Sequence, residues 1–159
     1  AYSKDSYPLP KIDTLVDAIA RHALLNFMDT FSGYHQIPLC PEDQEKTAFA
    51  TDPGLHCYKV MPFGLKNTGA TCQRAIQTIF EDMQHKTVEC YINDLVVKLR
   101  KRPDQLRDLQ QIFERLRRCQ LKMNPLKCAF GVTSDKFLGF IVRHRGIEID
   151  PRRLLIRNL

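Results

Sequence analysis

The sequence predicts an α+β fold, an antiparallel sheet with helices packed on one face. Short β-rich segments recur in pairs separated by turn residues, which is typical of hairpins. Two longer segments space their apolar residues as amphipathic helices do. Hairpins that alternate with helices favour an antiparallel sheet with helices laid on it. At 159 residues and 43% hydrophobic content, the chain can bury the core of a single domain.

The first part of the chain predicts a short helix and a buried strand. Residues 10–22 place apolar side chains on one helical face, namely Ile12, Leu15, Val16 and Ile19. Residues 24–28 form an apolar run that ends in Asp29, and Ser32 and Gly33 then break it. That pattern predicts a buried strand with a carboxylate at its C-terminal end.

The middle of the chain predicts short elements followed by a long helix. The short elements are a strand at 36–39, a helical turn at 41–43, and strands at 47–51 and 55–60. Asp52-Pro53-Gly54 joins the last two strands as a tight turn. After a loop at 61–67, Thr68 is expected to cap a helix that runs to about His85.

The last part predicts two more hairpins around a second long helix. Strands at 88–91 and 95–99 enclose Asn93 and Asp94. Pro103 and Asp104 open a helix to about Cys119, with an apolar stripe of Leu106, Leu109, Ile112, Phe113 and Leu116. Strands at 136–142 and 147–149, which turn at Arg145-Gly146, complete the fold.

Charge and cysteine usage narrow the class of protein. The net charge of +6 favours a polyanionic partner, nucleic acid or an anionic membrane, although a protein that is simply basic fits equally. The cysteines show no CxxC pair and no zinc-finger spacing, which predicts free thiols in a reducing compartment: Cys40, Cys57, Cys72, Cys90, Cys119 and Cys128. With no signal peptide and no long apolar span, we expect an intracellular protein, cytoplasmic or nuclear, that does not enter membranes.

Two acidic residues stand where strands end. Asp29 closes a buried strand, and Asp94 lies at a hairpin tip. Carboxylates from neighbouring strands can hold two Mg²⁺ ions about 3.5–4 Å apart, the arrangement that promotes phosphoryl transfer. From spacing alone structural roles stay open, because Asn-Asp suits a tight hairpin turn and Asp29 could simply end its strand.

Seven segments carry a family resemblance when read in order: YPLPKIDTLVDAIA, FMDTFSGYHQI, PEDQEKTAFAT, YKVMPFGLKNTGATCQR, CYINDLVVK, LKMNPLKCAF and KFLGFIV. They resemble the successive blocks of reverse transcriptases from gypsy-class LTR retrotransposons, with plant elements the most similar. The resemblance covers nearly the whole chain. It implies the palm and part of the fingers of an RNA-directed DNA polymerase.

The resemblance also assigns roles to single residues. Asp29 and Asp94 become catalytic ligands of Mg²⁺. Tyr34 matches the aromatic residue that crowds the sugar 2′ position and so selects deoxynucleotides. Phe63 and Gly64 lie in the loop that contacts the incoming nucleotide and the template.

Two further matches lie near the C-terminal end. Lys127 matches a lysine proposed to protonate the leaving pyrophosphate, and Phe137-Leu138-Gly139 resembles the hairpin that grips the primer. The implied partners are a dNTP and a template-primer of RNA–DNA or DNA. Without the family, Lys127 reads as a surface lysine, the three-residue segment as part of a strand, and Tyr34 as a half-buried tyrosine.

One departure from the family pattern bears on activity. The family's metal-binding hairpin carries two adjacent aspartates after Tyr-x, whereas residues 91–94 read YIND, so Asn93 replaces the first aspartate. The amide keeps the shape and loses the charge, which predicts weaker metal binding and an inactive or severely impaired enzyme. Glu89 is a poor substitute, since four strand residues separate it from Asn93 by about 13 Å.

The match also predicts a fragment, residues 1–159 as one domain without thumb, connection or ribonuclease H regions. Two readings follow: a piece of a polymerase, or a non-catalytic retroelement remnant that binds nucleic acid or a protein partner. Basic residues crowd the second long helix and the segment before it: Arg100, Lys101, Arg102, Arg107, Arg115, Arg117 and Arg118. They could bind phosphates without sequence preference or form an ordinary solvated face.

Overall fold

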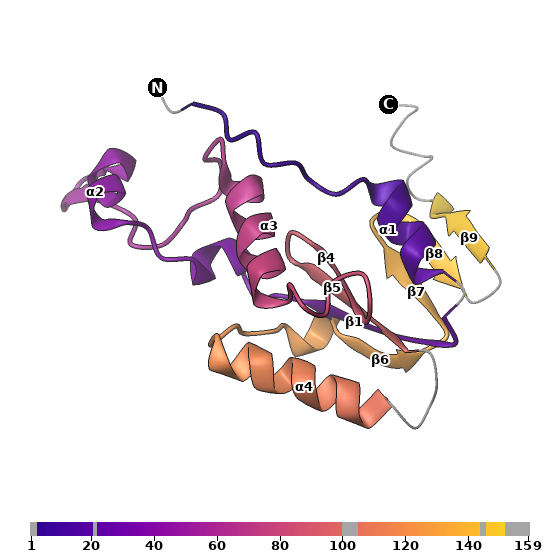
Figure 1. The fold of residues 1–159 in the computed structure, drawn as a ribbon. Coiled ribbons are helices and arrows are strands. Elements are labelled where there is room, and N and C mark those ends of the chain that lie inside the picture. The colour runs from indigo at the N-terminus through magenta and orange to yellow at the C-terminus, as the bar shows by residue number, and fades with distance from the viewer. Residues whose placement is uncertain (1–2, 21, 100–104, 144–145, 152–159) are drawn as a thin grey trace.

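The computed structural model describes residues 3–20, 22–99, 105–143 and 146–151. A four-stranded antiparallel sheet with the order β4-β5-β1-β6 forms its centre. Its strands are β1 (Leu24–Asp29), β4 (Val88–Tyr91), β5 (Asp94–Leu99) and β6 (Ala129–Val132). Figure 1 shows helices on both sides of this sheet.

The two long helices cover one face of the sheet, as the sequence predicts. They are α3 (Thr68–Ile79) and α4 (Gln105–Arg118). Ile76 of α3 and Ile112 of α4 pack with Leu95 of β5 in one buried cluster. The apolar stripe of an amphipathic helix leaves water by facing the sheet in this way.

The opposite face is also covered, which explains why β1 has buried apolar side chains on both of its faces. The short helix α1 (Ile12–Ile19) packs there beside a three-stranded sheet. That sheet consists of β7 (Ser134–Phe137), β8 (Phe140–Arg143) and β9 (Gly146–Ile149). Leu25 and Phe27 of β1 are buried on this side. A strand covered on both faces needs apolar side chains at successive positions.

A smaller part of the chain extends beyond α3, away from β7–β9 (Figure 1). Its elements are η1 (Gly33–Gln36), α2 (Pro41–Gln44), η2 (Glu45–Thr47), β2 (Phe49–Thr51) and β3 (Gly54–His56). Asp52 and Pro53 form the turn between β2 and β3, as predicted. Every residue of β2 and β3 is exposed, so these two strands contribute little to the core.

Three predicted elements are wrong. No strand forms at 36–39, because Gln36 ends the short helix η1 and the following residues make only an isolated bridge, Pro38 with Val60. Thr68 does not cap α3: it is the first helical residue, and its hydroxyl donates to the carbonyl of Leu65. The helix ends at Ile79 and not near His85, since Phe80 and Met83 turn into the core.

The predicted strand at 136–142 is a hairpin. Leu138 and Gly139, with φ of 50° and 82°, form the turn between β7 and β8. Positive φ at both central residues is what a tight hairpin turn needs. The strand β6 and the short helix η4 (Pro125–Lys127) were not predicted. Pro103, Asp104 and Arg145 lie outside the described residues.

All six cysteines are free thiols in the structure. Among the described residues, none of the helices has the length and apolar character required to cross a membrane.

Candidate active site

Asp29 and Asp94 lie directly opposite each other on adjacent strands. Asp29 is the last residue of β1, Asp94 is the first of β5, and the two pair in the antiparallel register. Directly opposed residues in such a ladder have Cα atoms about 4.5–5.5 Å apart. The prediction that the two aspartates lie side by side is therefore confirmed, and their catalytic role remains a separate question.

The two carboxylates repel each other and share one nearby cation. Burial raises the pKa of Asp94 to about 6, the charge of Asp29 adds to the rise, and Lys127 opposes it. Lys127, at the end of η4, donates from Nζ to Oδ2 of Asp29 at 3.2 Å. A site whose carboxylates are partly desolvated and close together gains stability from a cation.

The donor set fits a divalent cation. Two carboxylates supply the hard oxygens that Mg²⁺ prefers, and this ion commonly takes its remaining ligands from water and substrate phosphates. Within the described ranges, however, no group of three or more His, Cys, Asp or Glu side chains gathers around a possible metal position. Asp29 and Asp94 would therefore hold the ion with few anionic ligands of the protein.

Asn93 stands in the turn next to this pair. Its carbonyl accepts a hydrogen bond from the amide of Thr30 at 2.9 Å, which ties the turn to the end of β1. Its side-chain Oδ1 accepts from the thiol of Cys72 at 3.5 Å. A Cβ built on Gly33 would lie 2.2 Å from that oxygen, so only glycine leaves the amide its space.

The predicted nucleotide-binding residues come together. The rings of Tyr34 and Phe63 meet edge to face at 5.1 Å, and His35 makes a similar contact with Phe63. Burial raises the pKa of Tyr34, which keeps the phenol neutral. Gly64 follows with a φ of 91°, a backbone conformation that favours glycine.

The predicted primer-grip residues divide into a core residue and a turn. Phe137 is buried and packs on Phe27 of the central sheet at 6.1 Å between ring centroids. Leu138 packs against the same cluster as Tyr91, the last residue before the Ile92-Asn93 turn. Gly139 accepts a hydrogen bond from the amide of Asp150. The hairpin is thus fixed to the sheet that carries the acid pair.

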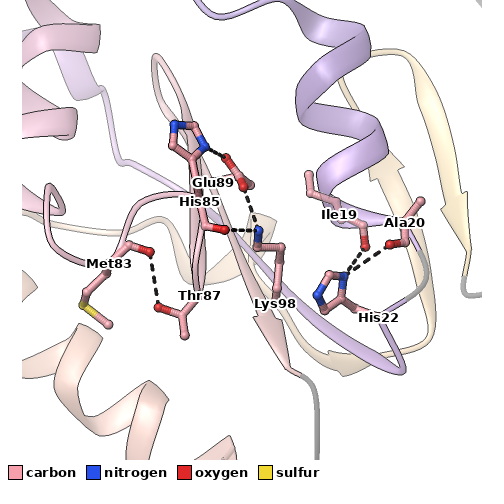
Figure 2. Close-up of polar contacts among 8 residues, drawn as sticks. All are labelled: Ile19, Ala20, His22, Met83, His85, Thr87, Glu89 and Lys98. Carbon is pink, nitrogen blue, oxygen red and sulfur yellow. Dashed lines mark hydrogen bonds and ion pairs between the residues drawn. The ribbon is translucent and has the colours of Figure 1, made fainter.

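Glu89 has a structural partner of its own. The side chain is fully buried, with Lys98 Nζ at 2.7 Å from Oε1 and His85 Nδ1 at 3.1 Å from Oε2 (Figure 2). Lys98 also donates to the carbonyl of His85. Glu89 is therefore held in an ion pair and cannot substitute for the carboxylate missing at Asn93.

The sequence analysis assigned no role at the site to Gly33, Cys72 or Gln73, although all three lie against the turn that carries Asn93. Each of them has ordinary explanations. Gly33 follows a strand, Cys72 is a small apolar residue, and Gln73 is a polar residue on the buried face of α3. The one available signal was Gln73, a polar side chain on the apolar face of a helix.

Comparison with known proteins places this site in a family. Residues 1–142 match the family described as "Reverse transcriptase (RNA-dependent DNA polymerase)". The chain is 33% identical over 147 residues to a retrovirus-related Pol polyprotein from transposon 297 of Drosophila melanogaster. It is 29% identical over 150 residues to the corresponding polyprotein from transposon gypsy of the same species. These matches take in 92% and 94% of the chain and 14% of each polyprotein.

Solved structures give the same fold. A foamy viral protease-reverse transcriptase in complex with RNA/DNA hybrid superposes with a TM-score of 0.86 over 98% of the chain and 21% of that protein, at 18% identity. The form in complex with double-stranded DNA gives 0.88 over 99% of the chain and 28% of that protein, also at 18% identity. The chain belongs to the reverse transcriptase family, and its relatives are the Pol polyproteins of gypsy and other LTR transposons.

Proposed function

We propose that residues 1–159 are one domain fragment, the palm and part of the fingers of a retrotransposon RNA-directed DNA polymerase, with catalysis impaired at Asn93. The register that pairs Asp29 with Asp94 carries this proposal. It sets two carboxylates side by side, as nucleotidyl transfer with divalent ions requires. The similarity of the motifs to plant elements stays a prediction.

The residues around the acid pair have separate roles in this proposal. Asp29 and Asp94 would hold Mg²⁺, which when bound activates the attacking oxygen and stabilises the leaving one. Lys127, whose ammonium lies beside Asp29, would donate a proton to a leaving pyrophosphate. Tyr34 and Phe63 form an aromatic wall that would orient the incoming dNTP.

Asn93 is the reason to expect impairment. Its amide is neutral, so the site has two carboxylates where the family pattern has three. Mg²⁺ binds ionised oxygens most strongly, and the loss of one weakens both metal binding and stabilisation of the charged transition state. Glu89 is held in a buried ion pair with Lys98, and among the described residues no third acidic side chain gathers with Asp29 and Asp94 around a metal position.

The chain spans 14% of the length of the Pol polyproteins from transposons 297 and gypsy. We propose that template and primer, RNA–DNA or DNA, are held largely by regions beyond the matched part, including the rest of the fingers and the thumb. Phosphoryl transfer depends on positioning, so the fragment alone should extend a primer poorly even with a complete acid set.

Primer extension by a longer polypeptide of the parent reading frame, with the remaining fingers and the thumb, tests this function. We expect trace extension with Asn93 and at least about a hundredfold more with Asn93→Asp, in line with the effect of removing one transition-state charge interaction. Equal activity of the two would refute the impairment. No activity in either, with the polypeptide folded, would refute the polymerase assignment.

The second candidate function is a non-catalytic module that binds nucleic acid or a protein. The exposed arginines of α4, Arg107, Arg117 and Arg118, favour it, whereas Arg115 is held by Asp82. Binding of a labelled RNA–DNA duplex at low and moderate salt tests it. We expect weak binding that falls steeply with salt, because phosphate contacts release counterions. Binding that ignores salt, or none at low salt, would favour a protein partner.

A further inference from the structure

Gln73 of α3 makes both of its hydrogen bonds to the backbone of the hairpin that carries Asn93 and Asp94. The side chain is fully buried. Its Nε2 donates to the carbonyl of Cys90 at 3.0 Å, and its Oε1 accepts from the amide of Ile92 at 2.6 Å. One side-chain amide therefore contacts two backbone groups of the same strand end.

The two contacts replace a missing strand. β4 is at the edge of the central sheet, where its outward N–H and C=O groups have no neighbouring strand to bond. An amide side chain carries the same donor and acceptor as a peptide bond, so Gln73 pairs with Cys90 and Ile92 as a short strand would. The C=O of Cys90 and the N–H of Ile92 are thereby hydrogen-bonded by a buried side chain instead of by water.

The residue that Gln73 holds is in an unusual conformation. Ile92 has a φ of 52°, which is rare for a β-branched residue and persists only where the surroundings enforce it. The thiol of Cys72, the neighbour of Gln73, lies 3.6 Å from the carbonyl oxygen of Ile92, and its single proton is shared between that oxygen and Oδ1 of Asn93. The two consecutive side chains of α3 thus hold Ile92 at its N–H and at its C=O.

The conformation of Ile92 controls where the acid pair forms. Tyr91 pairs with Asp94 across the turn, and Asp94 pairs with Asp29 on the other side. If the Ile92-Asn93 turn relaxed, the first residue of β5 would lose the register that sets its carboxylate opposite Asp29. We propose that Gln73 is a positioning residue, whose bidentate amide fixes the Ile92 turn and thereby holds Asp94 opposite Asp29.

The proposal requires a donor and an acceptor at the end of the side chain. Methionine has nearly the length of glutamine and supplies neither a strong donor nor a strong acceptor. An ionised glutamate can accept from the amide of Ile92 but cannot donate to the carbonyl of Cys90, whereas a protonated one can do both. The effect of Gln73→Glu should therefore depend on pH, in a way that loss of packing volume does not explain.

Amide hydrogen exchange of the full chain, followed by NMR, tests the proposal without any metal or substrate. In Gln73→Met we expect the Ile92 amide to exchange at least about tenfold faster than in the parent, the effect of losing one hydrogen bond. The matched control is Gln77→Met, one turn along α3, whose side chain accepts from the hydroxyl of Tyr7. Exchange at Ile92 should not change in that variant.

Gln73→Glu keeps the test decisive if the methionine variant does not fold. Relative to the parent at each pH, protection of Ile92 should be near normal at low pH. It should be reduced at high pH, because the ionised carboxylate repels the carbonyl oxygen of Cys90 and the turn loosens, although the amide of Ile92 still has an acceptor. Unchanged protection in every Gln73 variant would overturn the proposal, and so would a loss equal at all pH values.

Metal binding, which rests on the proposed function, is measured separately. The affinity for Mn²⁺ should fall in Gln73→Met and stay at the parent value in Gln77→Met. If the parent binds no Mn²⁺, the function fails while the exchange result still decides the role of Gln73.

Discussion

At the scale of single residues, the site combines two carboxylates that repel each other with a tightly packed turn. Asp29 and Asp94 are forced together by register, and Lys127 offsets only part of their repulsion. The turn beside them is tightly packed. The side-chain oxygen of Asn93 leaves no room for a side chain at Gly33 and accepts a hydrogen bond from Cys72. Changes at these positions should therefore alter stability as well as function.

Asp94→Asn should stabilise the metal-free protein at high pH. The folded-state pKa of Asp94 is about 6, above the ordinary 3.8, so the native state binds the proton more tightly than the unfolded state. Stability then falls as pH rises through the window from about 4 to about 6, and the cost persists above it. We expect a higher Tm for the variant at pH 8 and a shrinking difference as pH approaches 4.

Thermal unfolding at pH 4, 6 and 8 measures this dependence. Asp52→Asn, on the exposed turn between β2 and β3, is the control and should change Tm little at any pH. A benefit of Asp94→Asn that is equal at pH 4 and pH 8 would contradict the repulsion inferred for the pair.

Gly33→Ala should destabilise the fold. The new methyl group would lie 2.2 Å from Oδ1 of Asn93 and 2.4 Å from Oγ1 of Thr30, so the turn or β1 must shift. Overpacking of this kind costs about 1–3 kcal/mol. Gly69→Ala is the matched control, because its methyl group would meet only the Cδ1 of Ile92 at 3.9 Å and alanine favours a helix. Urea unfolding that ranks Gly33→Ala as stable as the parent would contradict the packing described.

At the scale of elements, the sequence predicted helices and strands best where one hydrophobic periodicity extends over the whole segment. The strands β1 and β5 and the helix α4 were assigned correctly because core packing and local pattern agree there. Within the predicted stripe of α4, Ile112 and Leu116 are buried, but Leu106 is largely exposed and was wrongly placed in the core. The acid pair was predicted from strand-end position together with family resemblance, and the register confirmed it. The roles of Tyr34, Phe63, Gly64 and Lys127 came from resemblance alone, and their function stays a prediction.

The elements that were missed depend on tertiary context. The sequence predicts a strand at 36–39, yet Gln36 belongs to η1 and the residues after it find only one bridge, to Val60. Leu138 takes a positive φ that its residue type disfavours, so sequence alone reads 136–142 as one strand. The place of Gln73 could not be read either, because its partners are backbone groups of a distant hairpin.

The ion pair between β4 and β5 is an element-scale prediction. Lys98→Met should destabilise the protein by about 3–5 kcal/mol, since it removes the buried cation and leaves Glu89 with only the exposed His85 as a partner. The double variant Glu89→Leu/Lys98→Met should recover most of the loss, because two apolar side chains can replace a buried pair. Equilibrium unfolding of the three proteins measures both effects. A double variant less stable than Lys98→Met would contradict the idea that the pair is mainly structural.

At the scale of the whole molecule, two covered faces explain the position of the site. The sheet is sealed by α3 and α4 on one side and by α1 with β7–β9 on the other, so the ends of β1 and β5 are where the central strands open to the outside. Asp29 is partly exposed there, next to the largely exposed Lys127. The fold thus presents its acid pair at a sheet end, with η1 and the Phe63 loop beside it.

The central claim is that Asp29 and Asp94 form a metal site weakened by Asn93. Titration of Mn²⁺ or Mg²⁺ into the parent chain, Asn93→Asp and Asp29→Asn tests it most directly, because only the ligand set differs. We expect weak binding by the parent, an affinity higher by about tenfold or more in Asn93→Asp, and little binding in Asp29→Asn, since each added anionic oxygen strengthens a Mg²⁺ site. Equal affinity of the parent and Asn93→Asp, or binding that survives in Asp29→Asn, would contradict the claim.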